Sequence, residues 1–126
     1  MIGEKKIYII AEIGMNHRGH LKIAKKLIRD AKESGADAAK FQIFEPDTLG
    51  RKIKKSYFTP DATIKKLKNY CKLLKIDFIC SVFDYKSLMR VKKIGLKFIK
   101  IASSEVNNLE LLKEIKKTKI PSILST

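Results

Sequence analysis

The sequence predicts an α/β fold in which about five parallel strands alternate with four helices. Short apolar runs typical of buried strands alternate with segments whose apolar residues recur at helical spacing. Each unit of one strand and one helix takes roughly 20 to 35 residues. Right-handed crossovers join consecutive strands of such a chain into one parallel sheet. The pattern permits either an open doubly wound sheet of the flavodoxin type or the first five units of an eight-unit barrel.

The first strand is expected at Ile7 to Ile10, an apolar run that Glu12 follows almost directly. A loop with two glycines leads from there into a helix from Leu21 to Ser34, whose apolar residues have helical spacing. Gly35 supplies the end of this helix, because glycine is the usual residue after a helix C-terminus.

The second strand is expected from Ala36 to Ile43. Strand side chains alternate between faces, so Lys40 and Gln42 should share one face. A polar loop from Glu45 to Phe58 follows, and Thr59 is the expected N-cap of the next helix because a proline and an acidic residue come directly after it.

A third strand, Asp77 to Ser81, follows the second helix. Asp84 or Ser87 is expected to open a short third helix, because both residue types cap helix N-termini. Gly95 closes that helix.

The fourth strand lies in the segment from Lys97 to Glu105. Strands of a parallel sheet are covered on both faces, so Lys100 needs a partner or a ligand there. Asn107 or Asn108 should cap a fourth helix, and a last strand is expected from Ile120 to Leu124. The apolar residues expected to face inward on the fourth helix are Leu109, Leu112 and Ile115.

With 126 residues the chain is long enough for one domain with a sizeable core. Its net charge of +15 suggests a nucleic-acid ligand, since clustered cations bind phosphates by releasing counterions. Most lysines, however, recur on the expected outer faces of helices, without an aromatic-interleaved basic strand or a recognition-helix motif. Specific nucleic-acid binding is therefore not expected.

The sequence also indicates a compartment. It has no apolar run near the roughly 18 residues of a membrane span, and Met1 to Lys6 is polar, unlike a signal peptide. We therefore expect a cytoplasmic protein without membrane attachment. Cys71 and Cys80 lack close spacing and His or Cys companions, so both are expected to be buried, reduced thiols.

Polar residues collect at the expected carboxyl ends of the strands, where both candidate architectures bind ligands. Cations, hydroxyls and backbone amides suit a phosphate and a carboxylate, and glutamates beside them can transfer protons. The residues, in strand order, are Glu12, then Lys40 and Gln42, then Ser81, then Lys100, Ser103 and Glu105, and finally Ser125 and Thr126.

His17 and His20 are weak candidates for a metal site, because they lie in a loop without a third ligand nearby. We expect His17 to order the loop by hydrogen bonds, and we assign no metal ligand. The sequence also has no G-x-G-x-x-G and no P-loop lysine motif, so a nucleotide fold has no positive support.

Five motifs resemble those of the sialic acid synthase family, in matching order and spacing over essentially the whole chain. They are Ala11 to Gly19, Ala36 to Gln42, Phe78 to Phe83, Lys100 to Ser103, and Pro121 to Thr126. The family's barrels have eight βα units and usually precede a small antifreeze-like domain. The resemblance therefore implies a partial TIM (β/α) barrel, truncated after the fifth strand.

The resemblance implies a transferase of carbohydrate biosynthesis that condenses phosphoenolpyruvate with an N-acylated amino sugar of the N-acetylmannosamine type. In the family, C3 of phosphoenolpyruvate attacks the open-chain aldehyde, water adds at C2, and phosphate leaves with C–O cleavage. By resemblance, Lys40 and Gln42 would hold phosphoenolpyruvate. Ser81, Lys100, Ser103 and Ser125 would surround its phosphate, and Glu12 and Glu105 would serve the sugar, the water or the metal.

The family also implies a divalent cation, Mn or Mg, whose two histidine ligands come later in the family's sequences. Residues 1–126 would then be the amino-terminal part of the synthase barrel, without its second half or the antifreeze-like domain, and inactive alone. The exposed strand edges favour a complementary chain or a second copy as partner. The alternatives are an open-sheet module that binds anions or a partner, and a gene remnant without activity.

Overall fold

A computed structural model describes residues 7–45, 47 and 55–126. The segment from Met1 to Lys6 and much of the predicted loop from Glu45 to Phe58 lie outside the described residues. The strands are β1 (Ile10–Gly14), β2 (Ala38–Ile43), β3 (Asp77–Val82), β4 (Ile99–Ile101) and β5 (Ser122–Leu124). The helices are α1 (Leu21–Glu33), α2 (Asp61–Leu73), α3 (Tyr85–Ile94) and α4 (Leu109–Thr118), with short 3-10 helices η1 (Lys55–Tyr57) and η2 (Ser103–Glu105).

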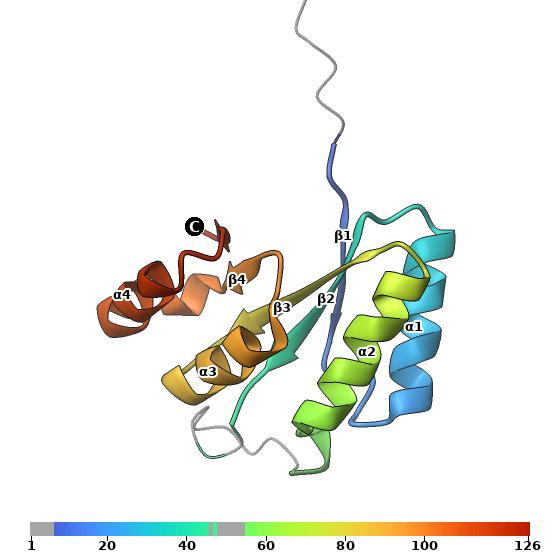
Figure 1. The fold of residues 1–126 in the computed structure, drawn as a ribbon, viewed down its shortest axis with the longest axis horizontal. Coiled ribbons are helices and arrows are strands. Elements are labelled where there is room, and N and C mark those ends of the chain that lie inside the picture. The colour runs from blue at the N-terminus through green and yellow to red at the C-terminus, as the bar shows by residue number, and fades with distance from the viewer. Residues whose placement is uncertain (1–6, 46, 48–54) are drawn as a thin grey trace, which may run out of the picture.

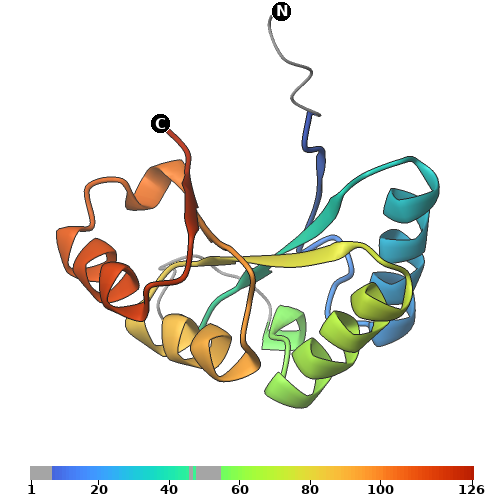
Figure 2. The ribbon, with the colours of Figure 1, turned by 45° about the horizontal axis from the view of Figure 1, so that its top comes forward.

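The five strands form one parallel sheet in the sequential order β1-β2-β3-β4-β5. A flavodoxin-type sheet has the order 2-1-3-4-5 and carries helices on both faces. Here the helices lie along one face, and the sheet curves so that β1 and β5 are the two ends of an arc (Figure 1 and Figure 2). The fold is therefore the partial (β/α) barrel that the sequence predicted, and its sheet is open.

The hydrophobic core lies between the sheet and the helices. Apolar side chains from alternate strand positions meet the apolar faces of α1 to α4 there, as expected from the two-residue and helical periodicities. Cys71 and Cys80 are both buried in this core and are not joined to each other, which confirms the predicted burial of the two thiols.

The first strand begins later than the sequence suggested. The predicted strand at Ile7 to Ile10 is wrong: β1 starts at Ile10, and both Ile7 and Ile9 are exposed. The reason is that β2, the only neighbour of β1 in the described sheet, starts at Ala38, which is aligned with Ile10. The Ile9 carbonyl accepts the backbone N–H groups of Asp37 and Ala38 at 2.8 and 3.1 Å, and regular pairing starts at Ile10. Glu12 therefore lies inside β1 rather than after it.

Two helix starts agree with the predicted capping residues. Asp84 caps α3 in a capping box with Ser87, and Asn108 caps α4 by accepting the N–H of Leu111 at 3.1 Å. The prediction for α2 is wrong, because Pro60 occupies the cap position without a side-chain hydrogen bond and the Thr59 carbonyl accepts from Arg90 instead.

The buried face of α4 also differs from the prediction. Leu111 and Ile115 are buried and Leu112 is partly buried, whereas Leu109 is 66% exposed. Leu109 lies two residues before Leu111, which at about 100° per residue places it on the opposite side of the helix from this buried residue. Among the described residues, no helix is both long and apolar enough to cross a membrane.

Candidate anion site on the concave face

The sheet face opposite the helices, here called the concave face, carries the polar strand residues. In β2, Phe41 and Ile43 belong to the core between sheet and helices. Lys40 and Gln42 alternate with them and therefore project from the concave face, as the sequence predicted.

Strand register brings the polar residues of neighbouring strands side by side on this face. Gln42 of β2 is aligned with Ser81 of β3, and Ser81 is aligned with Lys100 of β4. Glu12 of β1 is aligned with Lys40 of β2. Aligned residues of a parallel pair point to the same face, so the five side chains share one surface that crosses four strands.

Lys40 and Glu12 form an ion pair in which the lysine is the buried partner. The Lys40 side chain is 11% exposed and that of Glu12 is 55% exposed. The pairing register of β1 shifts between Glu12 and Gly14, and a Cβ atom on Gly14 would lie 3.5 Å from Glu12 Oε1 and 3.6 Å from Gln42 Oε1. The carboxylate and the amide thus both lie over Gly14, a residue that the sequence analysis did not assign to the site.

Local hydrogen bonds supply the partners that Lys100 needs within the strand. Its Nζ donates to Ser125 Oγ at 2.5 Å and to the carbonyl of Ile101 at 2.9 Å. Burial lowers the pKa of Lys100, nearby Lys40 lowers it further, and Glu12 acts in the opposite direction. The two lysines are therefore close enough to repel each other, and an anion between them would relieve that repulsion.

Ser81 has a buried hydroxyl without a hydrogen-bond partner among the described residues. The residue is 1% exposed, and its Oγ makes no hydrogen bond to any residue of the described chain. Buried polar atoms are nearly always paired, so an exception needs an explanation. A ligand oxygen on the concave face, between Gln42 of β2 and Lys100 of β4, would supply the missing hydrogen-bond partner.

Two of the predicted site residues, Ser103 and Glu105, lie on η2 and not on the strands. Glu105 accepts hydrogen bonds from Asn108 Nδ2 at 2.9 Å and from Ser104 Oγ at 3.2 Å. Ser103 begins the exposed 3-10 helix η2. The structure thus brings Glu12, Lys40, Gln42, Ser81, Lys100 and Ser125 together, whereas Ser103 and Glu105 lie on η2, which follows β4.

His17 has a structural place in the loop after β1, where its Nδ1 accepts the backbone N–H of Gly19 at 3.1 Å. This agrees with the expectation that the histidine orders the loop. Within the described residues no group of three or more His, Cys, Asp or Glu side chains is arranged to hold a metal ion.

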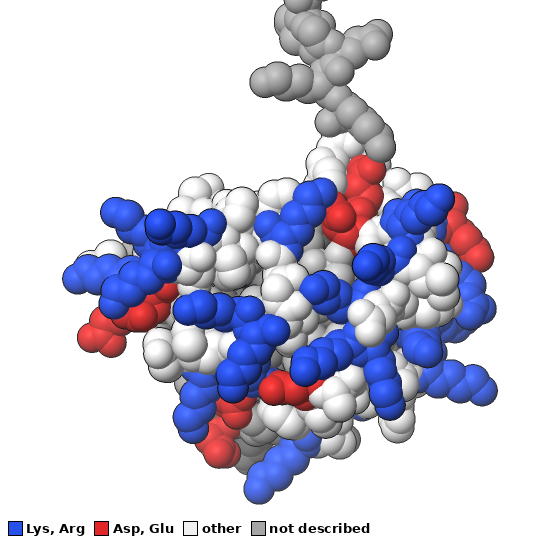
Figure 3. Space-filling model, in the orientation of Figure 1, with Lys and Arg blue, Asp and Glu red and all other residues white. Residues whose placement is uncertain are grey.

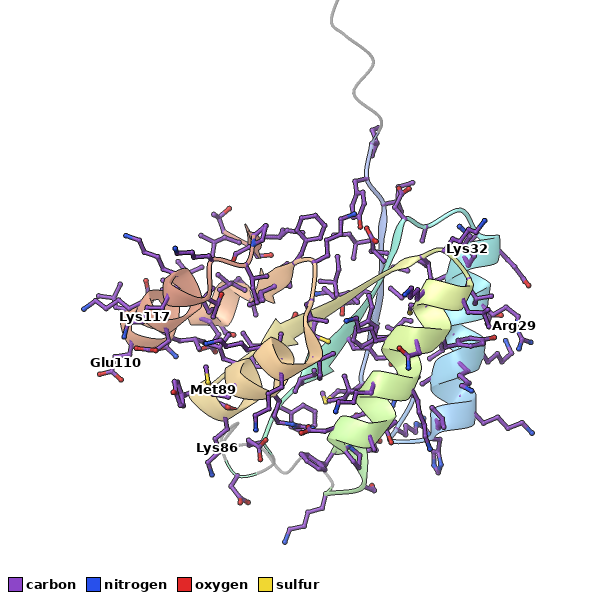
Figure 4. The ribbon with its side chains drawn as sticks, viewed as in Figure 1. Arg29, Lys32, Lys86, Met89, Glu110 and Lys117 are labelled. Carbon is purple, nitrogen blue, oxygen red and sulfur yellow. The ribbon has the colours of Figure 1, made fainter. Side chains whose placement is uncertain are left out.

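The outer helical surface carries most of the positive charge. Lys and Arg side chains are spread over the face shown in Figure 3 and are not gathered in one stripe. Figure 4 shows Lys86 of α3 and Lys117 of α4 on the outer side of their helices. A hollow of about 1060 Å³ between α3 and α4 lies in this outer layer, and none of the predicted site residues lines it. The candidate site is the concave face, where Lys40 is buried, Lys100 is partly buried and both share one surface.

Comparison with known proteins agrees with this geometry. The sequence model of the NeuB family matches residues 50–126, more than half of the chain. The chain belongs to the NeuB family. Among curated members, the N,N'-diacetyllegionaminic acid synthase of Campylobacter jejuni is 38% identical over 142 aligned positions, covering 97% of this chain and 42% of that protein. The N-acetylneuraminate-9-phosphate synthase of Drosophila melanogaster is 36% identical, covering 95% of this chain and 37% of that protein.

The fold of this NeuB-family chain is also found in a solved relative. The crystal structure of the N-acetylneuraminic acid synthetase of Leptospira borgpetersenii, in complex with citrate, superposes with a TM-score of 0.88 at 31% identity. The match covers 94% of this chain and 44% of that one. The chain therefore spans about two fifths of the length of the curated relatives cited above.

Proposed function

We propose that the concave face binds phosphoenolpyruvate, and that these residues form the phosphoenolpyruvate half of the active site of a nonulosonic acid synthase. Membership of the NeuB family and the acid synthases among its relatives support this proposal. In the proposed binding mode, Lys40 and Gln42 hold the ligand, and Lys100, Ser81 and Ser125 surround its phosphate.

The observation that carries the proposal is the unpartnered Ser81 hydroxyl beside two mutually repelling lysines. Lys40 is already paired with Glu12, so a phosphate dianion would chiefly neutralise Lys100, offset its repulsion by Lys40 and accept a hydrogen bond from the Ser81 hydroxyl. Lys100 is already held by Ser125 and the Ile101 carbonyl, which fixes its ammonium group before the ligand arrives. Such preorganisation lowers the cost of binding.

The acceptor in the proposed reaction is an N-acylated amino sugar of the N-acetylmannosamine type. C3 of phosphoenolpyruvate forms the new C–C bond with the sugar aldehyde, water adds at C2, and the C–O bond to phosphate breaks. Glu12, exposed and beside Lys40, and Glu105 on η2 are the carboxylates assigned to the sugar or the water. Residues 1–126 are thus proposed as the amino-terminal part of the barrel, and turnover requires further strands from the same protein or a second chain.

The divalent cation implied by the family does not fit the described residues, since they contain no suitable ligand group. We therefore derive no step through it from these residues. The proposed partners are the two small substrates and the residues that complete the barrel, and the proposed location is the cytoplasm.

The open sheet also supports a second candidate function, an anion-binding module that uses charge alone. In that case sulfate and phosphate would bind as tightly as phosphoenolpyruvate. Exposed helix lysines would also contribute as much as Lys40 and Lys100.

A calorimetric titration with phosphoenolpyruvate at low and then moderate salt separates the two functions. We expect Lys100→Ala to weaken binding about 10- to 100-fold, because a hydrogen bond to a charged group contributes roughly 1.5–3 kcal/mol. Lys116→Ala is the matched control, since Lys116 is exposed on α4. Salt should change the specific affinity only moderately, because screening acts mainly on charges separated by more than about 10 Å at 0.1 M salt.

Binding that is erased by moderate salt, or weakened equally by both substitutions, would contradict the proposed half-site and support the module that binds by charge alone. A half-site that binds phosphoenolpyruvate no better than sulfate would contradict it as well.

A further inference from the structure

The turn after β1 contains a buried histidine. His17 is 2% exposed, and its Nδ1 accepts the backbone N–H of Gly19 at 3.1 Å. Its ring packs against Phe41 of β2, with the ring centroids 5.6 Å apart. A ring nitrogen accepts a hydrogen bond only when it carries no proton, so this contact requires neutral histidine.

The same turn lies directly beside the anion site. Three backbone hydrogen bonds make residues 13–20 a compact arch: Asn16 N to Ile13 O at 3.1 Å, Arg18 N to Met15 O at 2.9 Å, and His20 N to His17 O at 2.8 Å. Gly14 belongs to this arch and lies against the side chains of Glu12 and Gln42. A shift of the arch would therefore move the surroundings of both side chains.

The arch also contacts η1, which follows β2 in the chain. A Cβ atom on Gly19 would lie 1.9 Å from the carbonyl oxygen of Ser56 in η1, so the two backbones are in direct contact. The hydrogen bond from Gly19 to His17 thus holds the residue through which the arch and η1 touch.

We propose that His17 is a positioning residue, whose buried imidazole accepts the Gly19 N–H and thereby holds Glu12 and Gln42 in place for anion binding. The proposal rests on the proposed function of the concave face. Protonated His17 cannot accept this hydrogen bond, so anion binding should weaken as His17 becomes charged.

The groups around His17 keep it neutral at pH 7.5. Burial lowers the pKa of His17 below its ordinary value of 6.5, and nearby His20 lowers it further. Arg18 is adjacent in the arch, Lys55 and Tyr57 flank Ser56 on η1, and Phe41 contributes no charge. Because the pKa of His17 is lower in the folded state, neutral His17 contributes its full share to the free energy of unfolding above pH 6.5. This contribution is lost as the pH falls below that value.

The test measures sulfate binding by calorimetry at pH 7.5 and about pH 5, because sulfate remains a dianion throughout this range. His17→Asn keeps an oxygen that can accept a backbone N–H two residues on, but it does not titrate. His17→Leu removes the acceptor and keeps an apolar side chain. His20→Asn is the matched control, since His20 is exposed.

We expect the wild-type affinity, relative to that of His17→Asn, to fall about tenfold between the two pH values. His17→Asn should bind like the wild type at pH 7.5, and His17→Leu should bind about tenfold more weakly at both pH values. His20→Asn should keep the wild-type loss of affinity, with its onset at a higher pH, because His20 no longer lowers the pKa of His17. A wild-type pH profile that persists in His17→Asn would overturn the proposal even if His17→Leu failed to fold. Absence of phosphoenolpyruvate binding by the wild type at pH 7.5 would instead overturn the proposed function.

Discussion

Two fully buried serines, Ser81 and Ser87, differ in whether their hydroxyls have hydrogen-bond partners. Ser87 Oγ donates to the Asp84 carbonyl at 3.0 Å and accepts from the backbone N–H of Asp84 at 3.2 Å, which completes the start of α3. Ser81 Oγ has no such partner among the described residues. An unsatisfied buried polar group lowers the free energy of unfolding by about 1–3 kcal/mol, so the Ser81 hydroxyl reduces the stability of the fold. A role in binding would explain why the hydroxyl is there.

Ser81→Ala should therefore raise the free energy of unfolding by about 1 kcal/mol and weaken phosphoenolpyruvate binding about tenfold. Ser87→Ala, the matched control, should lower the free energy of unfolding by about 1 kcal/mol, because it removes part of a helix cap, and should leave binding unchanged. Urea unfolding and calorimetry measure the two effects. A Ser81→Ala protein that is destabilised and binds normally would show that Ser81 has only a structural role.

Single residues of the site could be predicted because strand periodicity fixes which side chains share a face. Lys40 and Gln42 followed from the alternation in β2, and the need of Lys100 for partners followed from its place in a parallel strand. The contact of Gly14 with Glu12 and Gln42 could not be predicted, because it depends on the register shift between Glu12 and Gly14. Local sequence contains no clear signal for such a shift.

Between the elements, the loop after β1 touches η1 through a backbone contact of Gly19 with Ser56. Arg90 of α3 links Glu45, which follows β2, to Asp61 at the start of α2: its guanidinium lies 2.6 Å from Asp61 and 3.2 Å from Glu45. In the sequence Arg90 looks like any other basic helix residue. The caps of α3 and α4 were predictable because Asp84 and Asn108 act within one turn, whereas the partner of Thr59 lies 31 residues away.

Gly19→Ala should disrupt the contact between the loop after β1 and η1. Its Cβ would overlap the Ser56 carbonyl oxygen, and φ is +80°, so we expect a loss of more than about 2 kcal/mol in the free energy of unfolding and weaker anion binding. Gly35→Ala is the matched control, because φ is +85° but nothing lies within 4 Å of the added atom. It should cost about 1–2 kcal/mol and leave binding unchanged. Equal effects of the two substitutions on binding would contradict the proposed coupling of the loops.

For the whole molecule, strand order distinguishes the two architectures that periodicity left open. Helix and strand patterns determine that the sheet is parallel, but an open doubly wound sheet and a barrel segment share them. The family motifs resolved this choice, and the sequential order of β1 to β5 confirmed it. The two faces of the sheet therefore differ in function in our account. The outer, helical face carries solvated lysines. The concave face carries Lys40, which is aligned with Glu12, and Lys100, which is aligned with the buried Ser81.

The measurement that tests this account most directly is an NMR titration of the isotope-labelled protein with phosphoenolpyruvate, read at the backbone amides and lysine ammonium groups. We predict that the largest shifts occur at Lys40, Gln42, Ser81 and Lys100, with saturation at a common ligand concentration and little change on α1 to α4. Shifts spread over the helix lysines, or an unaffected concave face, would contradict the central claim that this surface is the phosphoenolpyruvate site.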